Sequence, residues 1–276
     1  MSEEPTQPER GRGEMPFLDH LEELRWRLIK SLIAVVVGIG GGYALVTHID
    51  VIAFLKHPIE KYLPAGQKLL FTSLMDPFLI QLKLAIAIGC VAALPVILYQ
   101  VWAFLRPALY QREAKIVIPM AFSGIVLFVI GSALGFYVVM PLAIPVLLSF
   151  STASLQPLLT ATEYFSLTLS IVLVFGAVFE VPLVMFLLIY MRLVSSSFLK
   201  KHHRTFIMVN AVASALLTPG DLVVMTLIAM IPIQLFYELA IVMAIVMEKR
   251  RAKAERLAEQ QSAQEDSDSV PAAGPA

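Results

Sequence analysis

Four long apolar segments dominate the sequence and limit what the chain can fold into. They run over about 28–46, 78–98, 116–140 and 165–190. A helix needs ~20 apolar residues to cross a hydrocarbon core of ~30 Å, and each segment meets that requirement. Hydrophobic residues make up 58% of the 276 residues and charged residues only 15%, which is typical of a chain embedded in a bilayer. We therefore expect an all-α, polytopic membrane protein.

A further apolar stretch, 206–247, is interrupted by the sequence Thr-Pro-Gly-Asp at 218–221. This is a turn signal, and Asp221 is well placed to cap the helix that follows it. The pattern predicts six transmembrane helices, of which the fifth and sixth are short. The fifth, about 205–217, is too short for a full span, so we expect the bilayer to thin around it or neighbouring helices to shield its ends.

Basic residues gather in the segments that lie on one side of the predicted helices. Those segments contain Arg10, Arg12, Arg25, Arg27, Lys30, Arg106, Arg112, Lys115, Arg192, Lys200, Lys201, Arg204, Lys249, Arg250, Arg251, Lys253 and Arg256. The opposite side holds only Lys56, Lys61 and Lys68. Because cytoplasmic segments carry the excess of Lys and Arg, this asymmetry predicts that both termini are cytoplasmic.

Polar segments flank the predicted membrane domain. We expect a disordered cytoplasmic tail over 1–15, a six-helix domain over 16–247 and a C-terminal tail over 248–276 that is basic and then disordered. The chain has no Walker phosphate loop, HExxH or CxxC motif, and its single cysteine, Cys90, lies in an apolar run. The histidines show no metal-ligand spacing. The sequence therefore predicts no cofactor, no metal and no enzymatic activity.

Several sequence motifs together resemble the TatC family of twin-arginine protein translocases. They are MPFLDHLEELRWRL at 15–28, LPVILYQVWAF at 94–104, PALY at 107–110 with Glu113, FGAVFEVP at 175–182 and LLTP at 216–219 with Asp221. The resemblance covers about 16–247. It implies a multi-pass receptor in the cell (inner) membrane that binds signal peptides carrying two adjacent arginines. With single-span TatA- and TatB-type subunits, it would move folded proteins across the membrane using the proton-motive force.

The resemblance has further implications for partners. Six helices cannot enclose a passage for a folded domain, so we expect the chain to associate with copies of itself or with its partner subunits. The lipid bilayer is its other partner, and no nucleic acid is expected. A nucleotide motif is absent, and a membrane potential supplies ~2.3 kcal/mol per charge per 100 mV, which agrees with the energy source that the resemblance implies.

Glu23 and Glu113 are the residues that we expect to read the two arginines of a signal peptide. Both are predicted at the cytoplasmic membrane boundary, at the start of the first helix and just before the third. A carboxylate accepts two parallel hydrogen bonds from a planar guanidinium, whereas lysine offers only a point charge. For Glu23 the alternative is an i,i+4 ion pair with Arg27, worth only ~0.2–0.5 kcal/mol. The resemblance favours recognition, because both glutamates occupy its motif positions.

Three more residues near this boundary match positions of the family. Phe104 and Pro107 lie after the second predicted helix, where an exposed aromatic ring could pack against the apolar part of a signal peptide. An interfacial aromatic belt is the alternative for the ring. Arg25 also fits ordinary anchoring by positive residues, and we expect it to orient Glu23.

Glu180 lies about midway along the fourth predicted helix, between Phe179 and Val181. A charge at that depth costs ~2.5–3.5 kcal/mol on insertion scales, so it should face a partner or water. The resemblance implies a contact with a partner's transmembrane helix, and an internal hydrogen bond to a residue such as Thr226 is the alternative. Where the family often has Gln, this chain has Met225, so a partner contact that relies on an amide there is in question.

The segment between the first two predicted spans resembles an outward-facing cap of the family. Pro58 and Asp221 occupy its motif positions. We expect structural roles for both: Pro58 fixes a loop shape and Asp221 caps the sixth helix.

A different function remains open on the residues alone. The chain could be a secondary transporter or channel for a small solute, with Glu180 as its proton or ion site. That function predicts saturable uptake by this chain alone, and indifference to changes at Glu23 and Glu113. A membrane enzyme built on Glu180 has weaker support, because no second catalytic group is evident.

Overall fold

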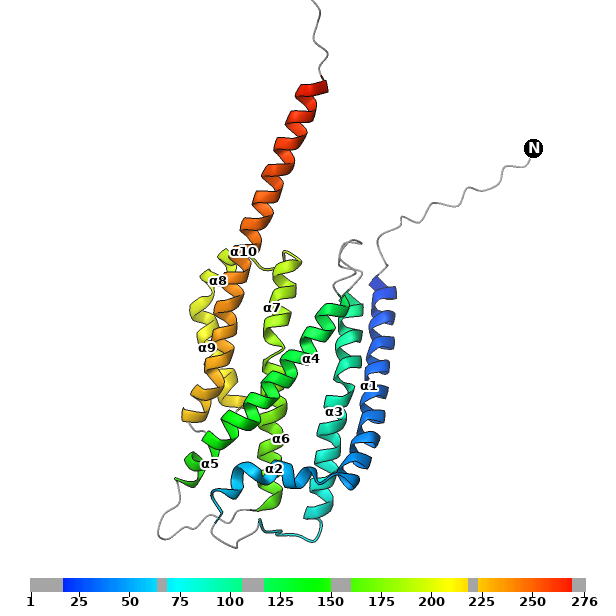
Figure 1. Cartoon of the computed structure of the whole chain (residues 1–276), viewed down its shortest axis with the longest axis vertical. Helices are drawn as coiled ribbons and strands as arrows, with labels where there is room; N and C mark the ends of the chain where they lie inside the picture. The colour runs from blue at the N-terminus through cyan, green and yellow to red at the C-terminus, as the bar shows by residue number, and fades with distance from the viewer. Residues whose placement is uncertain (1–16, 64–68, 106–116, 150–159, 218–222, 270–276) are drawn as a thin grey trace, which may run out of the picture.

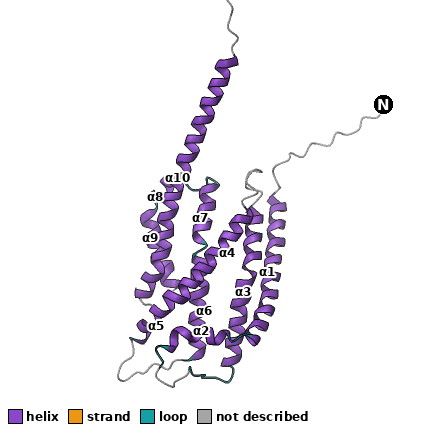
Figure 2. Ribbon diagram, in the orientation of Figure 1, coloured by secondary structure: helices purple, strands orange, loops and turns teal. Residues whose placement is uncertain are grey.

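The computed structural model describes residues 17–63, 69–105, 117–149, 160–217 and 223–269, which fold almost entirely as helices (Figures 1 and 2). In chain order the elements are α1 (Phe17–His48), α2 (Val51–Glu60), α3 (Asp76–Leu105), α4 (Val117–Leu134), η3 (Gly135–Val139), α5 (Met140–Leu148), α6 (Ala161–Val178), α7 (Val181–Tyr190), α8 (Ser196–Lys201), α9 (His203–Leu217) and α10 (Val223–Ser269). The predicted all-α class is confirmed. The predicted tail at 1–15 lies outside the described residues.

Five helical segments of the described chain are long and apolar enough to cross a membrane. They are Asp19–His48, Asp76–Leu105, Ile118–Leu148, Ala161–Tyr190 and Thr226–Ser262. Their outward faces are apolar; Val36 and Val37 of α1, for example, are 61% and 69% exposed. The fifth predicted helix is α9, whose 15 residues extend about 22 Å at the α-helical rise. That length is less than a hydrocarbon core of ~30 Å, as the sequence predicted for this helix, so the described residues contain five full-length spans and the short α9.

Glycines allow α1 and α3 to lie side by side along one edge of the bundle (Figure 1). A Cβ atom on Gly89 of α3 would lie 2.5 Å from the backbone nitrogen of Ile39. A Cβ atom on Gly42 of α1 would lie 2.5 Å from the carbonyl oxygen of Ala85. Small residues of this kind let transmembrane helices approach backbone to backbone. The contact fixes the start of α1 relative to the end of α3, where the candidate site lies.

The third span changes its helical winding just before Pro141. Proline has no N–H group and its ring clashes with the carbonyl group four residues earlier, here that of Tyr137. The chain responds with one π-helical turn, η3, in which the N–H group of Met140 donates to the carbonyl oxygen of Gly135. The span continues as α5 beyond this wider turn.

The fourth span is broken into α6 and α7, whereas the sequence predicted one continuous helix over 165–190. Phe179 and Glu180 form a turn between the two helices, and Pro182 lies in the first turn of α7. Pro182 cannot donate to Val178, and its ring would clash with that carbonyl group, so α6 ends there. The break places Glu180 at the junction of two helices rather than inside one.

The helix α2 lies across one end of the bundle and runs from the end of α1 past α6 toward α5 (Figure 1). The carboxylate of Asp50 caps it by accepting a hydrogen bond from the N–H group of Ala53 at 2.9 Å. The sequence predicted that Pro58 shapes a loop, but Pro58 lies in the last turn of α2, buried beside Leu55 and Ile59. A proline near the end of so short a helix removes one hydrogen bond, and its ring adds to the core.

Hydrogen bonds at the far end of the bundle tie α10 to α7 and α8. The guanidinium of Arg251 donates to the carbonyl oxygen of Tyr190 at 2.7 Å and lies 6.0 Å from the centre of that ring. The carboxylate of Glu248 accepts from the backbone N–H group of Ser196 at 2.7 Å and from its hydroxyl group at 2.5 Å. These contacts satisfy backbone groups at the end of α7 and the start of α8.

The last helix is longer than predicted. The sequence predicted a short sixth helix and a tail over 248–276 that becomes disordered, but α10 has 47 residues and continues to Ser269. Its extension is rich in Ala, Glu, Lys, Arg and Gln, which are strong helix formers. Every residue over 252–262 is exposed, so this part is helical through local preference rather than packing.

Candidate functional site

Five side chains meet where α1 begins and α3 ends, and we call them the Glu23 cluster. They are His20, Glu23, Arg27, Gln100 and Phe104. The three from α1 share one face, because residues three and four apart are neighbours on a helix. The guanidinium of Arg27 donates to the side-chain oxygen of Gln100 at 3.3 Å, and the rings of His20 and Phe104 stack with centroids 4.3 Å apart.

Within the cluster, the two carboxylate oxygens of Glu23 have different surroundings. Its Oε1 atom accepts hydrogen bonds from Arg27, one from Nε at 2.9 Å and one from Nη2. Its Oε2 atom is buried, has no hydrogen-bond partner among the described residues and lies 3.8 Å from Nδ1 of His20. The i,i+4 pair with Arg27 therefore exists, and it leaves one oxygen of the carboxylate unused.

The structure places the other predicted recognition residues in different ways. Phe104 is half-buried, and the stacked ring of His20 covers part of it. Arg25 is exposed, has no ion pair among the described residues and lies two positions from Glu23, which places it on another face of α1. Glu113 and Pro107 lie outside the described residues.

Sequence reasoning missed His20 and Gln100 as members of this cluster. Gln100 lies four residues before Phe104, so the two share a face of α3, and His20 lies three residues before Glu23. Spacing could therefore have placed each pair on one face. It could not show that the two faces meet, because that depends on the packing of α1 against α3.

Glu180 is the second candidate site, near the middle of the bundle. One of its carboxylate oxygens, Oε1, is buried and has no hydrogen-bond partner in the described part of the chain. The other, Oε2, lies close to α4: a Cβ atom on Gly124 would be 3.0 Å from it. Thr226 is half-buried in α10, and the side chain of Met225 lies outside the described residues, as does Asp221. An oxygen acceptor is thus available between α4 and the α6–α7 break.

Comparison with known proteins gives consistent results over most of the chain. Residues 19–232 match the family model described as Sec-independent protein translocase protein (TatC). A Sec-independent protein translocase protein TatC from Desulforapulum autotrophicum is 36% identical over 247 residues, which cover 90% of each chain. The protein of that name from Escherichia coli K12 is 37% identical over 228 residues, covering 82% of this chain and 86% of its own.

A solved structure agrees with the sequence comparisons. The crystal structure of a twin-arginine translocase receptor, TatC, matches this fold with a TM-score of 0.72 and 34% identity. The match covers 82% of this chain and 98% of the other. The chain belongs to the TatC family of Sec-independent protein translocase proteins.

Proposed function

We propose that this protein is the receptor that binds twin-arginine signal peptides, and the core subunit through which folded proteins are exported. The observation that carries the proposal is the pairing of Glu23 with a guanidinium, that of Arg27, at the end of the bundle where α1 begins and α3 ends. Arg27 acts there as an internal stand-in for an arginine of the cargo. A partly buried carboxylate that already binds the guanidinium of Arg27 can also bind the guanidinium of a signal-peptide arginine, because the two guanidinium groups have the same geometry.

The unused oxygen of Glu23 supports the same proposal. Oε2 is buried, and no described residue donates a hydrogen bond to it; such a group costs ~1–3 kcal/mol until a donor reaches it. The stacked rings of His20 and Phe104 lie beside it and offer an apolar surface to the rest of a peptide. We propose Glu113, in the segment between α3 and α4, as the acceptor for the second arginine, with Arg25 and Pro107 at the rim.

We propose that both termini are cytoplasmic and that the protein resides in the inner membrane. The excess of Lys and Arg at the end of the bundle that holds the Glu23 cluster supports this orientation. In this arrangement α9 is a sixth, short span, and the bilayer around it is thinned. The proton-motive force is the energy source that fits a chain without a nucleotide motif.

We propose that Glu180 receives a polar group from the transmembrane helix of a TatA- or TatB-type subunit. Its unpartnered Oε1 atom supports this, since a buried acceptor in a membrane is expensive unless a donor arrives. Thr226 and Met225 of α10 belong to the same proposed site, and self-association would bring several copies together.

Site-specific photo-crosslinking of a twin-arginine precursor in membranes tests the receptor function. We expect Glu23→Ala and Glu113→Ala each to lower the crosslink about tenfold or more, because each removes at least one charge-assisted hydrogen bond worth ~1.5–3 kcal/mol. Glu22→Ala is the matched control, since Glu22 is the exposed neighbour of Glu23 on α1. A precursor with two lysines in place of its arginines should crosslink as poorly as the Glu23 variant.

Glu180→Ala separates recognition from assembly in the same experiment. The crosslink to the precursor should persist in this variant, while copurification of the single-span subunits falls. Equal crosslinking in all variants would remove the receptor proposal. Loss of the crosslink in Glu180→Ala as well would mean that the two sites are not separate.

A further inference from the structure

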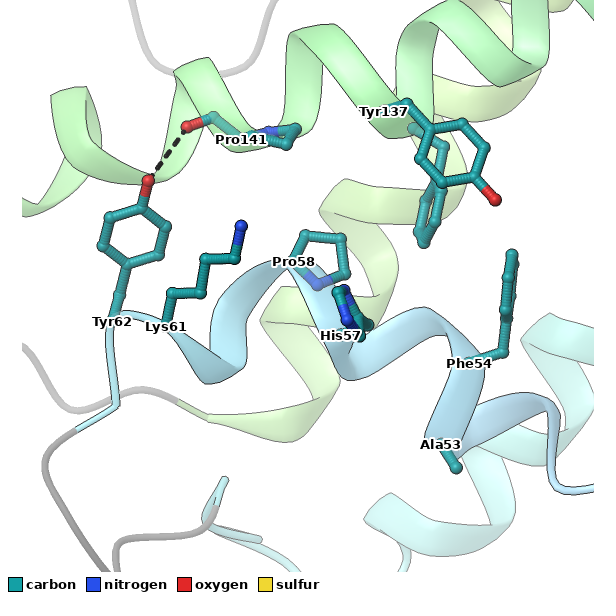
Figure 3. Close-up of a pocket in the computed structure, with 9 residues that line it drawn as sticks. Ala53, Phe54, His57, Pro58, Lys61, Tyr62, Tyr137 and Pro141 are labelled. Carbon is teal, nitrogen blue, oxygen red and sulfur yellow. Dashed lines mark hydrogen bonds between the residues drawn. The ribbon is translucent and has the colours of Figure 1, made fainter.

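We propose that the pocket between α2 and η3 binds the headgroup of an anionic phospholipid. The pocket has a volume of about 380 Å³ and lies at the end of the bundle opposite the Glu23 cluster. One wall is α2 and the chain just after it, and the other is the π-helical turn with the start of α5 (Figure 3). Its volume lies within the range of small-ligand sites, ~300–1,000 Å³.

Two side chains from α2 and its C-cap, the ammonium of Lys61 and the imidazole of His57, face this pocket without an acidic partner among the described residues. His57 and Lys61 lie four residues apart and are both exposed, and Figure 3 shows Lys61 extending toward Pro141. Neither forms an ion pair among the described residues, whereas the neighbouring Lys56 pairs with Glu60 at 3.3 Å. No carboxylate from the described part of the chain lines the pocket. A phosphate is the complementary group, since it accepts from both an ammonium and an imidazole N–H.

The partial negative charge at the C-terminus of α2 slightly disfavours an anion in the pocket, and the charge of Lys61 outweighs this effect. Lys61 is the C-cap of α2, and a helix C-terminus carries a partial charge of about −0.5 that falls off within one turn. The ammonium of Lys61 carries a full positive charge on a flexible stem that reaches beyond that turn. The net field in the pocket therefore favours a negative group.

Aromatic rings hold the wall of the pocket in place. Phe54 of α2 stacks on Phe136 of η3 with centroids 5.1 Å apart, and Phe136 meets Tyr137 edge to face at 5.0 Å. At the other end the hydroxyl group of Tyr62 donates to the carbonyl oxygen of Pro141 at 3.4 Å (Figure 3). These contacts join α2 to the third span, so the pocket is bounded by packed groups from both.

The position of the pocket selects a lipid rather than a soluble phosphate. The helix α2 lies across the ends of the apolar spans, and a bilayer around those spans would place its headgroups at this level. Tyr137 is 64% exposed beside the pocket, and Val138 and Leu142 next along the span are 50% and 49% exposed. Acyl chains attached to a phosphate in the pocket would continue along this apolar surface.

Crosslinking with a photoreactive phosphatidylglycerol tests the proposal on the purified full chain in phosphatidylcholine vesicles. We expect adducts within 51–62 or 136–142, mapped by mass spectrometry, and fewer with a photoreactive phosphatidylcholine of the same acyl chains. Replacing His57 and Lys61 with Gln should lower labelling of these segments about fivefold or more, about fivefold being the effect expected of one basic residue, here Lys61, beside anionic lipid. Lys61→Arg should retain the labelling.

Two further variants keep the outcome decisive. Lys56→Gln is the matched control on the same helix, because its charge is paired with Glu60, and it should leave labelling unchanged. Tyr137→Ala leaves His57 and Lys61 in place and should weaken labelling by removing part of one wall. Equal labelling by the two lipids, or no effect of the double variant, overturns the proposal. Competition by glycerol 1-phosphate at the concentration of the lipid would show a site for a soluble phosphate instead, and would also overturn it.

Discussion

Among single residues, Glu180 has an unfavourable environment within the described chain. Its Oε1 atom is buried without a hydrogen-bond partner from the residues that the structure describes, and Glu180 lies in the break between α6 and α7. A buried acceptor without a donor costs ~1–3 kcal/mol. Folding alone does not favour a glutamate here, and this agrees with a role in which a donor comes from another molecule.

We therefore expect Glu180→Leu to preserve or increase the stability of the isolated protein. Leucine has a similar volume and carries no polar group that needs a partner, so the change should stabilise by up to about 1–3 kcal/mol. Unfolding by SDS in mixed micelles, followed by circular dichroism, measures this. Glu180→Gln is the control, because an amide keeps the need for a partner and should give no gain. A clear loss of stability in Glu180→Leu would show that the carboxylate is bonded within the folded chain.

Among the elements, the contact between α1 and α3 has the strictest steric requirement. Gly89 faces the backbone of α1 at Ile39, whereas Gly41 lies on the exposed face of α1, where an added Cβ atom would have nothing within 4 Å. The contact holds the helix that carries Glu23 against the helix that carries Phe104. The geometry of the candidate site thus depends on residues far from it.

Gly89→Ala should destabilise the protein, because the added Cβ atom meets backbone that cannot move without separating the helices. We expect a loss of about 1–3 kcal/mol, the usual result of overpacking. Gly41→Ala is the matched control, and it should be neutral or stabilising by up to about 1 kcal/mol through helix propensity. SDS titration measures the stability of both variants. Equal stabilities would show that the contact between α1 and α3 adapts to the added Cβ atom.

The apolar runs predicted most of these elements, because a span must satisfy its backbone internally and therefore must be helical. The apolar runs could not predict where prolines interrupt or distort the spans. Pro182 ends α6, and Pro141 induces a π turn, yet Pro95 is accommodated within α3. Whether a proline breaks a span depends on which neighbours satisfy the freed carbonyl group, and the sequence does not contain that information.

For the candidate site, the sequence identified Glu23, Phe104 and Arg27 but not how they meet. The motif placed the glutamate at the start of a helix, and helical spacing offered Arg27 as its partner. The stacking of His20 on Phe104 and the bond from Arg27 to Gln100 join residues about eighty positions apart. Such contacts follow from tertiary packing.

At the scale of the whole molecule, α10 extends well beyond the end of the bundle (Figure 1). Two of its residues just past the apolar part, Glu248 and Arg251, bond to α8 and α7. Beyond them one exposed ion pair, Glu255 with Arg192 at 3.7 Å, reaches back to the bundle. An exposed pair of this kind contributes little.

Two truncations should therefore behave differently. A chain that stops after Arg256 should keep its stability and its export activity, because it retains both bonded residues. A chain that stops after Met247 loses Glu248 and Arg251, and we expect it to lose roughly 2–4 kcal/mol from broken charge-assisted hydrogen bonds. SDS unfolding and export of a reporter cargo measure the two effects. Similar loss in both chains would assign a role to the exposed part of α10.

The guanidinium that already rests on Glu23 has a consequence for the proposed receptor function. Because Arg27 occupies Oε1, an incoming arginine would add at the Oε2 atom and share the carboxylate with a second positive charge. The two guanidinium groups repel each other, so the bond to the cargo would not become nearly permanent. When the cargo leaves, Arg27 would still hold Oε1, and the carboxylate would be ready for the next precursor without an external step that resets it.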